Sequence, residues 1–143
     1  MSTPSQTILL VDDEPHVVHV VRFKLEQAGF EVIVANNGKV AFELAQKRKP
    51  ALVVTDFQMP GGSGLDLATQ MSRNPETNQI PLIMLTARGH RAPLSDLART
   101  NVRSLLAKPF SPRHLLAKVH ELLAAIPTAD RDATSKDTGS AAA

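Results

Sequence analysis

Five short apolar runs, each followed by a segment of helical periodicity, constrain this chain more than any other feature. The runs are rich in aliphatic and β-branched residues, as expected for strands that are buried on both faces of a sheet. They cover residues 7–11, 31–35, 51–55, 80–86 and 102–107. Strict alternation of strands and helices is typical of a doubly wound parallel sheet. The pattern therefore predicts an α/β fold with five strands and with helices on both faces.

Turn and cap signals place the helices and the end of the domain. The expected helices begin near residues 15, 38, 64, 93 and 112. Pro15 follows Glu14, an acidic residue that can cap the first helix, and Ser111 precedes Pro112 at the last. From residue 127 the sequence is small and polar without periodicity. We expect one domain at 6–126, followed at 127–143 by a disordered tail or a linker.

Composition excludes several classes of protein. No apolar run approaches membrane-spanning length, and residues 1–7 lack the pattern of a secretory signal. The chain has no cysteine, which excludes disulfides and thiolate metal sites and fits a cytoplasmic location. The net charge of +2 is too small and scattered to indicate direct binding of nucleic acid. We therefore expect a cytoplasmic protein that contacts neither membrane nor nucleic acid directly.

Charged and hydroxyl side chains stand where the strands end. Asp12 and Asp13 follow the first run, Asp56 follows the third, Thr86 ends the fourth and Lys108 follows the fifth. The carboxyl ends of parallel strands share one edge of the sheet, where α/β proteins bind their ligands. Carboxylates about 5 Å apart repel by about 3 kcal/mol per pair at an effective dielectric of 20. Such a cluster binds a proton, spreads apart or binds a cation, and an oxygen-only ligand set favours magnesium.

These residue types suit the formation of an aspartyl phosphate. A carboxylate is ionised at neutral pH and needs no general base to act as a nucleophile. Its obstacle is the negative charge of the phosphoryl donor, which a divalent cation and the Lys108 ammonium would offset. The sequence therefore predicts phosphoryl chemistry at Asp56.

Four motifs resemble the response-regulator receiver family of two-component signalling, over about residues 6–126. They are Leu9-Leu10-Val11-Asp12-Asp13-Glu14, Asp56 with Met59-Pro60 and Gly64, Leu85-Thr86-Ala87, and Lys108-Pro109-Phe110. The resemblance implies a flavodoxin-like sheet of order 2-1-3-4-5. It also implies that a histidine kinase or phosphotransfer protein supplies the phosphoryl group. Such a domain is a signalling module rather than an enzyme, because it only accepts the group and slowly loses it.

The resemblance also implies a role for each residue of the site. Asp56 would be the phosphoacceptor. Magnesium would be held by Asp13, Asp56 and the backbone carbonyl of Gln58, with Asp12 acting through water. Lys108 would bind a phosphoryl oxygen, and its peptide bond to Pro109 would be cis. The remaining roles are those of Thr86, which would move inward to the phosphoryl group, and of Gln58 and Arg88, which would tune its lifetime.

One departure from the family pattern concerns the switch. Receivers usually carry an aromatic residue or histidine three positions before the lysine, whereas this chain has Leu105. The readout that accompanies movement of Thr86 would then be weak or altered. An alternative function is a phosphorylation-independent interaction domain. A phosphatase of the haloacid-dehalogenase type is a further alternative, but position 58 is glutamine where those enzymes carry a second aspartate.

Basic residues gather in the fourth and fifth units of the sequence. They are Arg88, Arg91, Arg99, Arg103, Arg113 and Lys118. They could form an ordinary solvated surface or dock an acidic partner. The last helix resembles those of receivers that dimerise through the face of the fourth helix, fifth strand and fifth helix. The output partner is not identified, since no pattern of an output domain follows the last helix.

Overall fold

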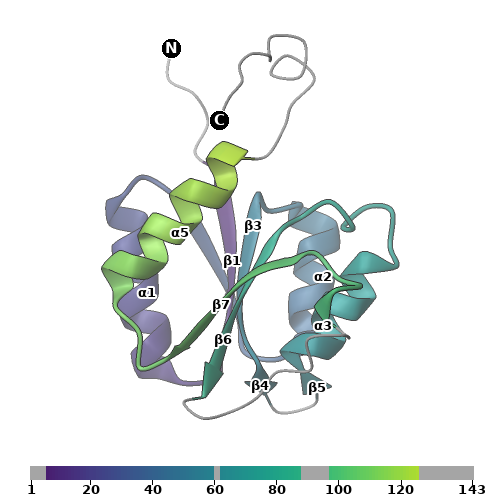
Figure 1. Ribbon diagram of the computed structural model, residues 1–143, viewed down its shortest axis with the longest axis horizontal. Helices are drawn as coiled ribbons and strands as arrows, with labels where there is room; N and C mark the ends of the chain where they lie inside the picture. The colour runs from purple at the N-terminus through teal and green to yellow at the C-terminus, as the bar shows by residue number, and fades with distance from the viewer. Residues whose placement is uncertain (1–5, 60–61, 88–96, 126–143) are drawn as a thin grey trace, which may run out of the picture.

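The core of the protein is a five-stranded parallel sheet in the order β2-β1-β3-β6-β7 (Figure 1). The computed structural model describes residues 6–59, 62–87 and 97–125. The strands are β1 (Thr7–Val11), β2 (Glu31–Ala35), β3 (Leu52–Asp56), β6 (Leu82–Ala87) and β7 (Val102–Lys108). Counted in chain order, these five strands give the predicted arrangement 2-1-3-4-5. The two-residue strands β4 (Gln58–Met59) and β5 (Gly62–Ser63) form a separate antiparallel pair.

Helices cover both faces of the sheet (Figure 1). The described residues contain α1 (Pro15–Gln27), α2 (Gly38–Arg48), α3 (Gly64–Ser72) and α5 (Pro112–Ala125). Helices α1 and α5 lie on one face, and α2 and α3 lie on the other. The short helix expected at 93–98 and the tail at 127–143 fall almost wholly outside the described residues. Among the described helices, none combines the length and the apolar character needed to cross a membrane.

Alternation along the strands divides the core into two clusters. The α1–α5 cluster contains Leu10, Val54 and Leu106 from the strands, together with residues of α1 and α5. The second cluster contains Leu9 and Val53, with residues of α2 and α3. Central strands β1 and β3 are buried almost throughout, whereas β2 is only partly buried. This difference confirms the prediction that residues 31–35 form an edge strand.

Local capping explains where the helices begin. The Asn37 side chain accepts a hydrogen bond from the backbone N–H of Val40 and starts α2. A reciprocal capping box between Ser63 and Asp66 starts α3. Glu14 precedes α1, but its side chain makes no capping hydrogen bond, so that expectation is wrong. Its carboxylate turns instead toward Lys108 at the end of β7.

Candidate functional site

Three charged side chains meet where β1, β3 and β7 end. The Lys108 Nζ lies 3.1 Å from Asp12 Oδ2 and 3.3 Å from Asp56 Oδ1. Each of the three residues stands two positions after a strand residue that belongs to the α1–α5 cluster. Because side chains alternate along a strand, they share one face of the sheet edge. The structure thus brings the predicted acidic residues and the predicted lysine together.

Asp13 completes a group of three carboxylates. Oxygen atoms of Asp12, Asp13 and Asp56 all lie within 4.8 Å of one another. Asp12 and Asp56 are buried, whereas Asp13 is exposed. Oxygen ligands at this spacing are the type that magnesium prefers, and the exposed Asp13 leaves the group open to solvent. The donor set therefore fits a hard divalent cation.

Burial and charge shift the protonation of Asp56 and Lys108. Burial, together with the negative charge of Asp12, raises the pKa of Asp56, although Lys108 opposes the shift. Burial alone would lower the pKa of Lys108, but hydrogen bonds to Glu14 and Asp12 outweigh it and raise that pKa. Lys108 is therefore a permanent cation at physiological pH. Asp56 is a carboxylate whose negative charge is only partly compensated.

Glu14 belongs to the site, and the sequence interpretation missed it. Its Oε1 lies 2.9 Å from Lys108 Nζ, the shortest of the three contacts that the ammonium makes with carboxylates of the described residues. The Glu14 backbone N–H donates to Asp12 Oδ1 at 2.9 Å. The position of Glu14 directly after Asp12 and Asp13 was the available signal. A residue next to two strand-end carboxylates reaches the same edge of the sheet.

The loop after Asp56 is held by short backbone contacts. The Phe57 N–H donates to the Leu85 carbonyl at 2.8 Å, and the Gly64 N–H donates to the Phe57 carbonyl at 2.6 Å. A Cβ on Gly64 would overlap the backbone carbonyl oxygen of Asp56. Glycine is thus required here by the close approach of the loop. Gln58, two positions after Asp56, lies in β4 and has an exposed side chain.

Thr86 and Leu105 lie toward the other face of the sheet. Thr86 is buried and pairs in register with Ala107, while Leu105 pairs with Met84 of the α2–α3 side. The Leu105 side chain is 38% exposed. It borders a hollow of about 430 Å³ that Arg103 also lines. Arg88, the predicted tuning residue, lies outside the described residues.

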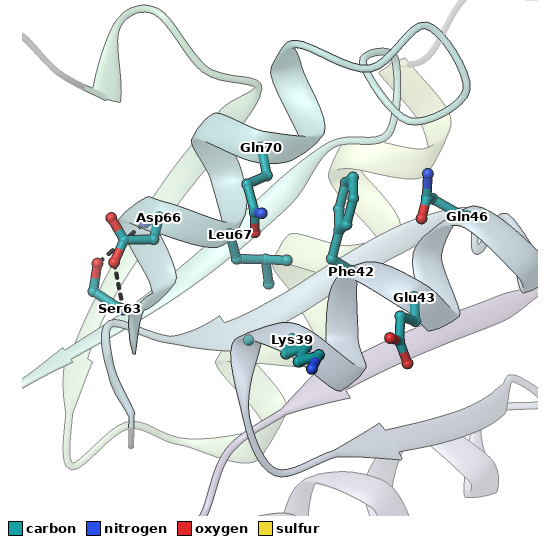
Figure 2. Close-up of a pocket in the computed structure, with 9 residues that line it drawn as sticks. Lys39, Phe42, Glu43, Gln46, Ser63, Asp66, Leu67 and Gln70 are labelled. Atoms are coloured by element: carbon teal, nitrogen blue, oxygen red, sulfur yellow. Dashed lines mark hydrogen bonds between the residues drawn. The ribbon is translucent and has the colours of Figure 1, made fainter. Parts of the chain in front are cut away.

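Two further hollows differ in their relation to the site. A cavity of about 530 Å³ lies beside Lys108 and is lined mainly by apolar residues of α1 and of the segment 109–112. The peptide bond between Lys108 and Pro109 at its edge is cis. A second hollow, of about 410 Å³, lies between α2 and α3 (Figure 2). It contains none of the predicted site residues, and its Ser63 and Asp66 side chains cap α3.

The basic residues of the fourth and fifth units are only partly described. Arg99, Arg103 and Arg113 are exposed. Lys118 lies 3.5 Å from Glu121 on the same helix. Arg88 and Arg91 fall outside the described residues. The structure therefore leaves the acidic-partner hypothesis as a prediction.

Comparison with known proteins identifies relatives along most of the chain. The sequence model of the response regulator receiver domain family matches residues 8–120. The phosphate regulon transcriptional regulatory protein PhoB of Pseudomonas aeruginosa is 38% identical over 118 residues, which cover 82% of this chain and 52% of that protein. The transcriptional regulatory protein SrrA of Staphylococcus aureus is 34% identical, with 83% and 48% covered. The chain thus spans about half the length of these relatives.

Solved structures share the fold. The chemotaxis response regulator CheY4 of Vibrio cholerae superposes with a TM-score of 0.75 at 26% identity, covering 83% of this chain and 99% of that one. The receiver domain of a Pseudomonas aeruginosa sensor histidine kinase gives a TM-score of 0.77 at 23% identity, covering 85% and 100%. That domain was solved with a magnesium ion coordinated in its active-site cleft.

Proposed function

The chain belongs to the response regulator receiver domain family, and on that premise we propose that Asp56 accepts a phosphoryl group in a two-component phosphorelay. The observation that carries the proposal is the position of the Asp56 carboxylate. It lies 3.3 Å from the Lys108 ammonium, in a group with Asp12 and Asp13 whose oxygens are within 4.8 Å. A nucleophile, a cation and further carboxylates at one open edge are the parts that this reaction requires.

The reaction replaces the acyl phosphate or phosphohistidine bond of the donor with an acyl phosphate bond on Asp56. An Asp56 oxygen forms a bond to phosphorus, and the bond from phosphorus to the donor breaks. Acetate leaves when acetyl phosphate is the donor, and the histidine imidazole of the donor protein leaves when the donor is a phosphohistidine. Lys108 binds an oxygen of the transferring group and offsets its negative charge. The physiological donor is a histidine kinase or a histidine phosphotransfer protein. The domain is a signalling module that accepts the group and slowly hydrolyses it.

Magnesium fits the donor set of the site. Asp13, Asp56 and the backbone carbonyl of Gln58 would hold it, and Asp12 would act through water. When bound, the ion offsets the negative charge of the three carboxylates and lowers the repulsion between Asp56 and an anionic donor. Asp12 is already engaged by Lys108 and by the Glu14 N–H, which supports an indirect role for it.

The switch is proposed to run through Thr86. The Thr86 hydroxyl binds the phosphoryl group, and the exposed Leu105 responds on the same face of the sheet. Gln58 and Arg88 tune the lifetime of the phosphoryl group. The output is an altered face of the fourth and fifth units, which controls an unidentified partner, with an acidic surface or a second copy of the chain as candidates. The receiver occupies residues 6–126 and acts in the cytoplasm.

Labelling by a small donor tests the proposal. On a phosphate-affinity gel, wild-type protein with acetyl phosphate and magnesium is expected to give a retarded band. Asp56→Asn should give none because it lacks the nucleophile, and wild type with EDTA should give none because the cation is removed. Glu43→Gln, which removes an exposed carboxylate of α2, is the control and should label as wild type does. Absence of label on wild type would instead favour a phosphorylation-independent interaction domain.

A further inference from the structure

We propose that the Glu14 carboxylate occupies the position on Lys108 that an incoming phosphoryl oxygen must take, and so slows phosphoryl acceptance by the resting protein. Glu14 would then be a positioning residue, which acts on the reaction through Lys108. The inference rests on the proposed function of Asp56. It adds Glu14, which is not among the proposed magnesium ligands, as a competitor for Lys108.

Carboxylates surround the Lys108 ammonium in the resting arrangement, and it donates hydrogen bonds to Glu14 and Asp12. An ammonium carries three N–H donors. Three carboxylate oxygens surround it, at 2.9 Å for Glu14, 3.1 Å for Asp12 and 3.3 Å for Asp56. A phosphoryl oxygen that approaches Lys108 therefore competes with these carboxylates for the ammonium.

Exposure decides which contact is lost. The side chain of Asp12 is 0% exposed, that of Asp56 is 12% exposed and that of Glu14 is 59% exposed. A carboxylate that leaves an ammonium must be solvated again, and a buried carboxylate that loses its partner is costly. Asp12 is also fixed by the hydrogen bond from the Glu14 N–H to its other oxygen. The exposed Glu14 carboxylate, by contrast, can leave Lys108 and be solvated by water at little cost.

Glu14 also stands apart from the carboxylates that could hold a cation. The group whose oxygens lie within 4.8 Å of one another consists of Asp12, Asp13 and Asp56. Glu14 instead contributes a negative charge at the ammonium that has to attract an anionic donor. Removing that charge should therefore favour anion binding while the cation ligands stay in place.

Beryllofluoride, which mimics the phosphoryl group on a carboxylate, separates these effects. At saturating magnesium, bound beryllofluoride is quantified by fluorine-19 NMR for wild type, Glu14→Gln and Glu26→Gln. The last variant removes an exposed carboxylate at the far end of α1 and has the same net charge. We expect Glu14→Gln to bind roughly two- to fivefold more tightly, as suits an exposed ion pair. Its second-order rate with acetyl phosphate should rise by the same factor.

The outcomes are distinct. Tighter beryllofluoride binding by Glu14→Gln, with magnesium affinity near that of wild type and Glu26→Gln unchanged, supports the competition. Equal or weaker binding by Glu14→Gln overturns it, since Glu14 would then be neutral or helpful in orienting Lys108. If wild type binds no beryllofluoride and takes no label at Asp56, the proposed function itself fails.

Discussion

Replacing Lys108 with glutamine is expected to destabilise the metal-free protein by about 2–4 kcal/mol, since removing one partner of a buried ion pair leaves the other uncompensated. Asp12 and Asp56 would lose their shared cation, and the folded-state pKa of Asp56 would rise further, because Lys108 opposes its upward shift. Folding would then take up protons, so the loss of stability should shrink as the pH falls. Magnesium should also restore part of the stability. Acceptance of phosphoryl groups should fall by at least about 10²-fold, because an electrostatic contact to the transferring group is lost.

Urea denaturation at several pH values, with and without magnesium, measures this effect. Lys118→Gln is the matched control, because it removes a lysine of α5 that pairs only with the exposed Glu121 among the described residues. Its unfolding free energy should change by less than about 1 kcal/mol. A Lys108→Gln protein as stable as wild type at pH 8 in EDTA would show that the lysine does not hold the carboxylates together.

Replacing Asp56 with asparagine should have the opposite effect on the metal-free fold. The pKa of Asp56 in the folded protein lies above its ordinary value of 3.8, mainly because of burial and the charge of Asp12. The proton is thus bound more tightly in the folded state. The stability that results is fully present below pH 3.8 and is lost as the pH rises through the folded-state pKa. An amide does not ionise and escapes this loss.

Asp56→Asn should therefore be more stable than wild type at pH 7 in EDTA, by on the order of 1 kcal/mol or roughly 3–6 °C in melting temperature. The difference should vanish near pH 3. Saturating magnesium should reverse the order, because a ligand that binds the folded wild type stabilises it by mass action. Thermal denaturation with Glu43→Gln as the charge-matched control checks these expectations. An Asp56→Asn variant less stable than wild type at pH 7 in EDTA would contradict the raised pKa of Asp56.

The sheet and most of the site were predictable because their causes are local or periodic. Apolar runs gave the bounds of β1 and β2 as observed. The fourth strand was predicted from residue 80 but begins at Leu82, because Pro81 has no N–H for the ladder, although its carbonyl still accepts from Val53. Convergence of Asp12, Asp56 and Lys108 followed from the common edge of parallel strands.

The position of Glu14 after Asp12 and Asp13 indicates the edge of the sheet, but it does not predict the pairing of Glu14 with Lys108. An acidic residue before Pro15 is an ordinary helix cap, and that is the local signal. The structure instead pairs it with an ammonium 94 positions later in the chain. Whether Glu14 caps α1 or pairs with Lys108 depends on tertiary contacts, which the spacing of residues in the sequence does not specify.

The central claim is that strand ends assemble a cation-binding carboxylate group in which Asp56 carries phosphorus. The most direct test is to label the protein with acetyl phosphate and magnesium, reduce the acyl phosphate with borohydride and locate the reduced residue by mass spectrometry. The account predicts reduction at Asp56 and nowhere else. Reduction at Asp12 or Asp13, or a labelled protein with no reduced carboxylate, would contradict it.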